Sequence, residues 1–224
     1  MTMPLLMAWS GGKDSALALQ RLLGDQRWRV EGLLTTVTTD YERISIHGVR
    51  RSILHAQAER LQLPLIEARI PPQASNEAYE AAFATALAEA RARTPDIDTI
   101  AFGDLYLADI RAYREQQLAH LGWHTHFPLW GEDTAQLAHC FVADGHRAIV
   151  CCVDTTQLDA SYCGREFDTA LLEDLPPSCD PCGENGEFHT CVYAGPLWRE
   201  PLTLARGERV LRDARFEYVD LATA

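Results

Sequence analysis

The chain has 224 residues, of which 47% are hydrophobic and 23% are charged, a balance typical of one globular domain or of a domain with a small appendage. Its formal net charge is −12, and without a cluster of basic residues this charge argues against a nucleic acid partner. No stretch approaches the roughly 20 apolar residues that span a bilayer. Seven unevenly spread cysteines and the lack of a signal-peptide pattern predict a cytoplasmic protein with reduced thiols.

Apolar runs alternate with segments of helical spacing along the first two thirds of the chain. The runs predict strands, and apolar residues three or four positions apart predict the helices between them. We expect strands at 5–9, 30–37, 63–70, 99–102, 125–127 and 148–153, and helices at 16–23, 48–61, 76–93, about 109–121 and 134–143. This alternation is typical of an α/β fold with a doubly wound parallel sheet.

The last part of the chain has a different character. Residues 158–175 show partial helical spacing, 176–186 are rich in Pro, Cys and Gly, and 189–193 and 215–219 have the composition of strands. We therefore divide the chain into a ligand-binding domain, 1–154, and a small C-terminal α+β segment, 155–224. Ligands of open α/β sheets bind at the carboxyl ends of the strands, so we expect the C-terminal segment to complete a cleft there.

A glycine-rich loop joins the first strand to the first helix, with the sequence Ser10-Gly11-Gly12-Lys13-Asp14-Ser15. Glycines let the backbone approach an anion, and a helix N-terminus presents unpaired N–H groups to it. A Walker A loop would need Gly at position 7 and Ser or Thr at 14, where the chain has Met7 and Asp14. The loop instead resembles the SGGxDS signature of the PP-loop ATP pyrophosphatases, which have a Rossmann-like fold and split ATP into AMP and pyrophosphate.

That resemblance implies roles for each loop residue. Ser10, Ser15 and the amides of Gly11 and Gly12 would hold the β- and γ-phosphates, and Lys13 would offset their charge. Asp14 would help to place Mg²⁺, whose preferred ligands are oxygens. ATP and Mg²⁺ are the implied cofactors.

A second motif, Asp180-Pro181-Cys182-Gly183-Glu184-Asn185-Gly186-Glu187-Phe188-His189-Thr190, lies near the other end of the chain. Together with the SGGKDS loop it resembles the diphthine-ammonia ligase (diphthamide synthetase) family, whose members carry DPCGENGE-[YF]-HT. Further matches follow in family order: His47-Gly48-Val49-Arg50, Gln57-Ala58, Leu63-Pro64-Leu65, Phe102-Gly103-Asp104, Arg111, Arg114-Glu115 and Pro128-Leu129-Trp130.

The family resemblance implies an ATP-dependent amide ligase that adenylates a carboxylate and then amidates it with ammonia. Two kinds of carboxylate, that of a small molecule and that of a protein side chain, stay open as the acceptor, and so does self-association into a homodimer. Catalysis would fall to Lys13, Asp14, Glu184 and Glu187, because carboxylates can bind ammonium, remove its proton or coordinate Mg²⁺. Acceptor binding would involve Gly183, Glu184, Asn185, Glu187 and His189.

Other parts of the predicted site follow from position. The ends of the second and fourth strands place Thr35, Thr36, Gly103 and Asp104 where adenosine would bind. His47 and Arg50 are candidates for contact with phosphate or the substrate carboxylate, since Arg grips such groups in bidentate fashion. The resemblance adds Arg111 to the substrate-binding set.

Several alternatives remain open at this point. The SGGKDS loop also begins PP-loop enzymes that act on tRNA or on other small molecules, and an ATP-binding sensor without chemistry would keep the same loop. Cys179, Cys182, His189 and Cys191 could be drawn as a zinc site, although the spacing between His189 and Cys191 is short for one. Diphthamide occurs only on the translation elongation factor of archaea and eukaryotes, so the acceptor depends on the source.

Overall fold

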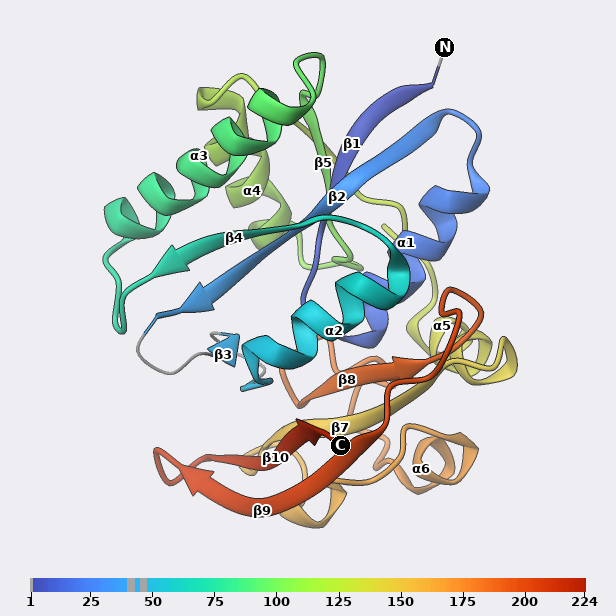
Figure 1. Cartoon of the computed structure of the whole chain (residues 1–224). Helices are drawn as coiled ribbons and strands as arrows, with labels where there is room; N and C mark the ends of the chain where they lie inside the picture. Colours follow the sequence, from blue (N-terminus) through green and yellow to red (C-terminus); the bar gives the residue numbers. More distant parts are fainter. Residues whose placement is uncertain (1, 40–42, 45–47) are drawn as a thin grey trace.

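The computed structural model describes residues 2–39, 43–44 and 48–224. A parallel sheet in the order β4-β2-β1-β5-β6 forms the upper half of the molecule (Figure 1). The strands are β1 (Met3–Ala8), β2 (Trp28–Thr38), β4 (Leu65–Ile70), β5 (Thr99–Ala101) and β6 (His124–His126), and the short β3 (Arg43–Ile44) pairs antiparallel with the end of β2. The predicted α/β class is confirmed.

Helices cover both faces of this sheet because successive strand residues point to opposite sides. Leu5 packs in one core with residues of the two helices on that face, and its neighbour Leu6 packs in a second core with residues of the other two. The first pair of helices is α1 (Lys13–Gly24) and α2 (Arg51–Leu61), and the second pair is α3 (Asn76–Arg93) and α4 (Ala108–His120). The sheet is therefore doubly wound.

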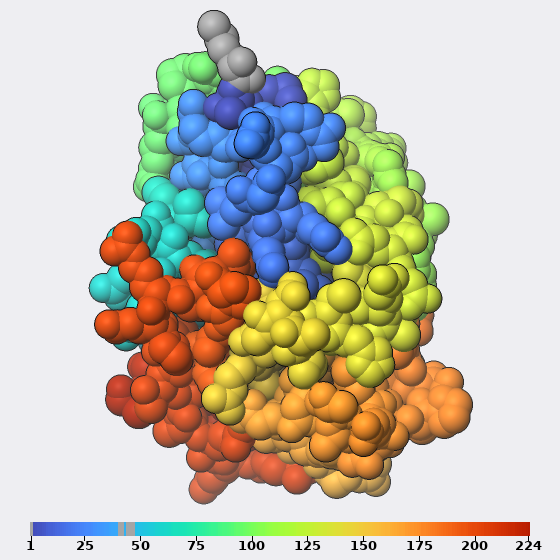
Figure 2. Space-filling view, turned by 90° about the vertical axis from the view of Figure 1, so that its right-hand side faces the viewer, coloured from blue at the N-terminus to red at the C-terminus, as the bar shows by residue number. Residues whose placement is uncertain are grey.

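A smaller antiparallel sheet, in the order β8-β7-β10-β9, lies at the bottom of Figure 1. Its strands are β7 (Arg147–Asp154), β8 (Phe188–Ala194), β9 (Leu204–Arg212) and β10 (Phe216–Thr223), and the nearby helices are α5 (Thr134–Ala143), the 3-10 turn Ala160–Tyr162 and α6 (Thr169–Asp174). Cys151 and Val192 of this sheet share one hydrophobic core with Leu5 and α1. Figure 2 shows the C-terminal residues, in orange and red, packed directly against the blue N-terminal ones.

The placement of β7 corrects one expectation. Residues 148–153 were expected to extend the parallel sheet, but β7 pairs antiparallel with β8 and β10 in the second sheet. All residues of β7 except Arg147 are buried, and a strand covered on both faces has the same apolar run in either kind of sheet. The sequence alone therefore could not assign its neighbours.

Among the helices in the described ranges, none combines the length and the apolar composition that crossing a membrane requires.

Candidate active site

A cavity of about 420 Å³ opens where the carboxyl ends of the parallel strands face the C-terminal segment. Part of its wall comes from the loop of residues 10–15, here called the phosphate loop, and from the ends of β1, β2 and β5, and another part comes from the 182–190 segment. The lining includes most of the predicted site residues: Ser10, Gly12, Lys13, Asp14, Ser15, Thr35, Thr36, Gly103, Asp104, Gly183, Glu184 and His189. Two motifs that lie about 170 residues apart in the sequence thus share one cavity.

The phosphate loop is compact and held by its own hydroxyl groups. Gly11 has a φ of +76°, a conformation that favours glycine. The Ser15 hydroxyl donates to the Gly12 carbonyl at 2.8 Å, and the Ser10 hydroxyl lies 3.2 Å from that of Ser15. Gly103 packs so closely on this loop that an added Cβ would lie 2.9 Å from the carbonyl carbon of Asp14, which explains why only glycine fits between strand β5 and the loop.

The second sheet holds the phosphate loop from behind. The amide of Val192 in β8 donates to the Gly11 carbonyl at 2.8 Å, and the Lys13 amide donates to Thr190 Oγ1 at 3.0 Å. Gly12 lies against the same strand, because a Cβ there would be 3.1 Å from the Thr190 carbonyl oxygen. The loop and β8 therefore form one hydrogen-bonded unit.

Gln57 of α2 completes this unit and is fully buried. Its Nε2 donates to the carbonyls of Gly11, at 3.1 Å, and of Val192, at 2.7 Å. Its Oε1 accepts from Trp9 Nε1 at 2.9 Å. The side chain thus joins β1, the phosphate loop and β8. Gln57 was noted in the sequence only as part of a family match, and a buried amide between apolar helix positions is the signal that could have revealed it.

The Lys13 ammonium points into the junction between the two motifs. Its Nζ lies 2.8 and 3.0 Å from the carboxylate oxygens of Asp14 and contacts the carbonyl of Cys182. The rings of Phe167 and Phe188 flank it, with centroids 5.8 and 5.5 Å away. Burial works to lower the pKa of Lys13, but Asp14, Cys182 and Glu184 together outweigh it and the pKa is raised. The side chain therefore stays charged.

The 180–187 loop folds around two carboxylates. Asp180 Oδ1 accepts from the amides of Cys182, at 2.9 Å, and Glu184, at 3.2 Å. Glu187 Oε1 accepts from the Asp180 amide at 2.9 Å and from Asn185 Nδ2 at 3.1 Å. Glu187 is 2% exposed and lies beneath the loop, so it shapes the loop from inside rather than lining the cavity.

Glu184, by contrast, lies in the cavity wall. Its Oε1 accepts from the Leu105 amide at 2.9 Å, which ties the loop to the segment after β5. Burial raises the pKa of Glu184 from its ordinary value of 4.5 to about 7, and the nearby Asp14 adds to this effect. A carboxyl group with such a pKa can accept or release a proton near neutral pH.

The end of the cavity near β2 and β5 combines a buried hydroxyl with apolar side chains. Thr35 Oγ1 is buried there with no hydrogen-bond partner within the described chain, and such orphaned groups are rare in native interiors. The apolar side chains of Phe83 and Phe102 line the same region. Arg114 stacks over the Phe102 ring, at 4.4 Å from its centroid, and pairs with Asp104 at 3.1 Å.

Two family models match the chain in succession, the diphthamide synthase N-terminal domain over residues 3–124 and the diphthamide synthase C-terminal domain over residues 133–221. The chain belongs to the diphthamide synthase family. It is also similar to the diphthine–ammonia ligase of Schizosaccharomyces pombe, with 25% identity over 224 residues. That alignment covers 93% of this chain and 37% of the S. pombe protein, so the chain spans little more than a third of the length of this relative.

The two models of the diphthamide synthase family meet between residues 124 and 133, ahead of the boundary that we placed after residue 154. The second sheet, including β7, lies within the range of the C-terminal model. The lining of the cavity is divided between the two matched ranges, because Asp14 belongs to the first and Glu184 to the second. The site therefore needs both.

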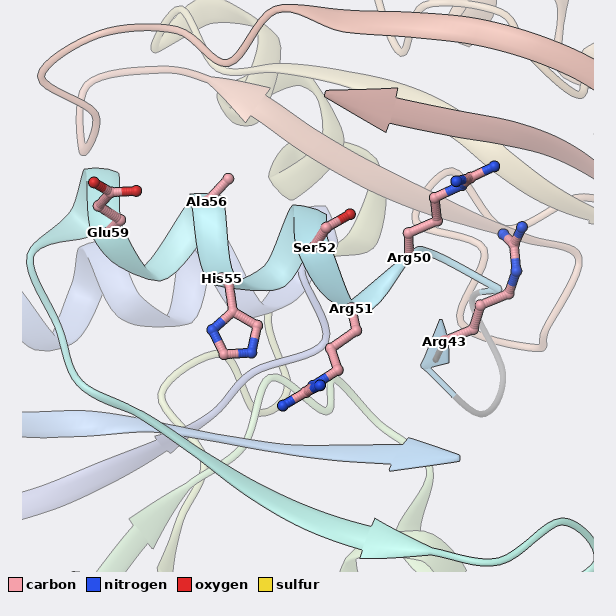
Figure 3. A pocket seen from close by; sticks show the side chains of 7 residues that line it. All are labelled: Arg43, Arg50, Arg51, Ser52, His55, Ala56 and Glu59. Atoms are coloured by element: carbon pink, nitrogen blue, oxygen red, sulfur yellow. The ribbon is translucent and has the colours of Figure 1, made fainter. Parts of the chain in front are cut away.

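Two arginines predicted to bind substrate lie outside the cavity. Arg50 lines a separate hollow of about 590 Å³ beside α2, where it and Arg43 both pair with Asp220. Figure 3 shows these two side chains on one side of the hollow, while Arg51 and His55 point to the other side, where both pair with Glu67.

Arg111 stacks over the rings of Phe127 and Trp130, 4.9 and 4.6 Å from their centroids, and pairs with Glu115. His47 lies outside the described residues. Asn185 is on the exposed tip of the loop, where its Oδ1 accepts from the Tyr106 hydroxyl at 3.0 Å. Neither Arg111 nor Asn185 is among the residues that line the cavity.

The residues drawn as a zinc site are not arranged as one. Among the described residues, which include all four, no group of three or more His, Cys, Asp and Glu side chains could hold a metal ion. Cys179, Cys182 and Cys191 belong to the hydrophobic core, and burial raises the pKa of each to about 12. His189 lines the cavity, and burial lowers its pKa to about 4, so its imidazole is neutral at pH 7.

Proposed function

We propose that this protein is an ATP-dependent ammonia ligase that forms an amide from a carboxylate and releases AMP and pyrophosphate. The main support for the proposal is the shared cavity, because the phosphate loop and Glu184 of the 180–187 loop both line it. Membership of the diphthamide synthase family and the similarity to the S. pombe diphthine–ammonia ligase support the same reaction class. A protein that only binds ATP, without catalysing a reaction, would not need the second motif.

We assign the two ends of the cavity to different parts of ATP. We propose that Ser10, Ser15 and the loop amides bind the departing pyrophosphate, because a helix N-terminus stabilises an anion there. Adenosine would occupy the region near β2 and β5, where the unpartnered hydroxyl of Thr35 can hydrogen-bond to it. Gly103 and Asp104 line that end of the cavity as well.

Asp14 fits the role of a magnesium ligand, since its carboxylate lies at the start of α1 in the cavity wall and is 29% exposed. Oxygen ligands from one or two carboxylates are typical of Mg²⁺ bound together with phosphates. The ion would supply positive charge to offset the triphosphate when bound. Within the chain, Lys13 already balances the carboxylate of Asp14.

The proposed reaction has two steps. A carboxylate oxygen of the acceptor attacks the α-phosphorus of ATP, and the bond to the β-phosphate oxygen breaks so that pyrophosphate leaves. Ammonia then attacks the acyl carbon and AMP leaves with the bonding electrons of the C–O bond. Because ammonium must lose a proton before it can attack, we assign Glu184 as the group that accepts this proton, and its pKa of about 7 suits that task.

The acceptor is a carboxylate whose identity we leave to experiment, since diphthine is named for the S. pombe protein and this chain spans only part of that length. The test incubates the purified protein with Mg-ATP, ammonium chloride and either diphthine-bearing elongation factor or a panel of small carboxylates. We expect AMP and pyrophosphate in equal amounts with one acceptor and a mass decrease of about 1 Da in that acceptor, because a hydroxyl is exchanged for an amino group.

Two results would contradict the proposal. Formation of ADP would exclude α,β cleavage, and tight ATP binding without turnover on any acceptor would indicate a sensor. Asp14→Asn is the matched negative control, since it preserves the size of the side chain but removes the charge, and we expect it to abolish AMP formation.

A further inference from the structure

Lys13 is the only lysine in the sequence, and the other nineteen basic residues counted with it are arginines. Although it stands in the phosphate loop, its side chain is only 2% exposed. The ammonium is enclosed by Asp14, by the carbonyl of Cys182 and by the rings of Phe167 and Phe188. Asp14 belongs to the first motif and Cys182 and Phe188 belong to the second, so the ammonium lies between the two.

The enclosure accounts for the charge of Lys13 without any ligand. A buried ammonium is costly unless it is paired and hydrogen-bonded, and Lys13 has both a carboxylate and a carbonyl within contact. Aromatic faces add a further attraction to a desolvated cation. To reach a phosphate instead, the ammonium would have to leave Asp14 and the carbonyl together, and the buried Cys182 carbonyl would lose its contact with the ammonium.

We infer that Lys13 is a positioning residue that holds the 182–187 loop against the phosphate loop, and that it does not ligate the phosphates. The inference rests on the proposed function, since it assigns a role within the same site. Through the Cys182 carbonyl, Lys13 fixes the segment that carries Glu184 two residues later, and through Asp14 it fixes the start of α1. Lys13 thereby sets the position of the 182–187 loop relative to the nucleotide.

The first test uses the single lysine as a spectroscopic probe. Growth on ¹⁵N-lysine labels only Lys13, so the ammonium gives one ¹H–¹⁵N signal. We expect this signal to be visible at pH 7, because a buried ammonium exchanges its protons slowly, and to show no coupling to ³¹P when magnesium pyrophosphate is bound. Loss of the signal through fast exchange, or a coupling to ³¹P, would overturn the inference.

This measurement also separates the inference from the proposed function. Calorimetry on the same sample reports whether magnesium pyrophosphate binds at all. A sample that binds pyrophosphate and shows the ³¹P coupling contradicts only the role of Lys13. A sample that fails to bind pyrophosphate contradicts the proposed use of the phosphate loop, and the proton exchange of Lys13 still tests its enclosure.

The second test compares variants. For Lys13→Met, which keeps the chain length but removes the charge, we expect the Kd for Mg-ATP to change less than about threefold while AMP formation falls at least about 30-fold. A parallel loss of ATP affinity would instead show a phosphate ligand.

Phe167→Leu keeps the inference testable if Lys13→Met does not fold. Phe167 flanks the ammonium but does not line the cavity, so we expect slower AMP formation with an unchanged Kd for Mg-ATP. Phe141→Leu, which trims the neighbouring buried ring without touching Lys13, is the matched control and should retain the turnover of the parent. Equal turnover in the two Phe variants would contradict the role of the enclosure.

Discussion

Glu184 is the acidic side chain whose proton affinity matters most for the proposed chemistry. Its pKa of about 7 reflects burial in the cavity wall. A carboxylate acts as a base only when ionised, so the rate of amide formation should rise as the pH increases through about 7. We expect Glu184→Gln to remove this inflection and to lower the rate about 100-fold or more, the usual contribution of a positioned proton acceptor.

Initial rates between pH 5.5 and 8.5 with saturating ammonium check this expectation. Glu173→Gln is the matched control, because Glu173 is exposed on α6 away from the cavity. An inflection near pH 7 that survives in Glu184→Gln would assign the proton transfer to another group.

Replacement of Thr35 tests whether its hydroxyl binds adenosine. Its hydroxyl is buried without a partner in the described chain, so Thr35→Val removes an unsatisfied polar group and should leave the stability of the free protein unchanged or slightly raised. If the hydroxyl donates or accepts a hydrogen bond with adenosine, the Kd of Thr35→Val for Mg-ATP should be about three- to tenfold higher than that of the parent. Loss of one neutral hydrogen bond gives a change of this size. Thermal unfolding with and without Mg-ATP measures both effects, and an unchanged Kd would contradict the assignment.

At the residue scale, the sequence predicted contacts best where a motif fixes the backbone. Asp14 and Glu184 were named from two short motifs, and the structure brings both into one cavity. Arg50 was named for the chemistry of its guanidinium group and Arg111 for the family resemblance, but in the structure Arg50 pairs with Asp220 and Arg111 stacks on Phe127 and Trp130. A long flexible side chain can reach many partners, so its position in the sequence does not decide its contacts.

At the scale of elements, Gln57 is the residue that joins α2 to the phosphate loop and β8. Gln57→Leu would leave Trp9 Nε1 and the Val192 carbonyl without the bond from Gln57, whereas the Gly11 carbonyl would keep its bond from the Val192 amide. Buried groups left unpaired cost about 1–3 kcal/mol each, so we expect the free energy of unfolding to fall by about 3 kcal/mol. For a chain of this size the Tm would fall by about 6–12 °C.

Calorimetric or fluorescence unfolding measures this loss. Glu59→Ala, two residues further along α2 and exposed, is the matched control and should shift the Tm by no more than about 2 °C. We also expect Gln57→Leu to weaken Mg-ATP binding, because Gln57 holds the Gly11 carbonyl. A variant that keeps both stability and affinity would show that the loop does not depend on this side chain.

Elements with a regular pattern were predicted closely, and those defined by their neighbours were not. The bounds of α3 and α5 agree with the expected 76–93 and 134–143, because amphipathic spacing and N-terminal caps are local signals. Strand β9 was missed, because its residues are almost all exposed and the strand has no apolar face that would give an alternating pattern. Strand β7 was found but assigned to the wrong sheet, because pairing depends on residues far away in the sequence.

At the scale of the whole molecule, one hydrophobic core runs from the parallel sheet into the antiparallel one. The two family ranges therefore do not form separate bodies with a flexible linker, and the loop that carries Glu184 cannot move without disturbing that core. This continuity explains how a cavity can be built from two motifs at opposite ends of the chain.

The stability of the whole protein should depend on pH through groups with opposite effects. Burial lowers the pKa of His189 from 6.5 to about 4 and also lowers the pKa of His126 and of His146. Because these imidazoles bind protons more readily when unfolded, their contribution to stability is lost as the pH falls below about 6.5. Glu184 acts in the opposite direction, since its raised pKa makes the folded state bind a proton first as the pH falls from about 7 toward 4.5.

Burial also raises the pKa of Asp14, so three imidazoles act against two carboxyl groups, and we expect the urea midpoint to decrease between pH 7 and pH 5. Glu184→Gln removes one of the two opposing contributions and should make this decrease steeper, whereas the control Glu173→Gln should follow the parent protein. Urea unfolding at half-unit pH intervals measures the slopes. A parent midpoint that rises on acidification would mean that the carboxyl groups outweigh the imidazoles, and an unchanged slope in Glu184→Gln would show that the folded cavity does not raise the proton affinity of Glu184.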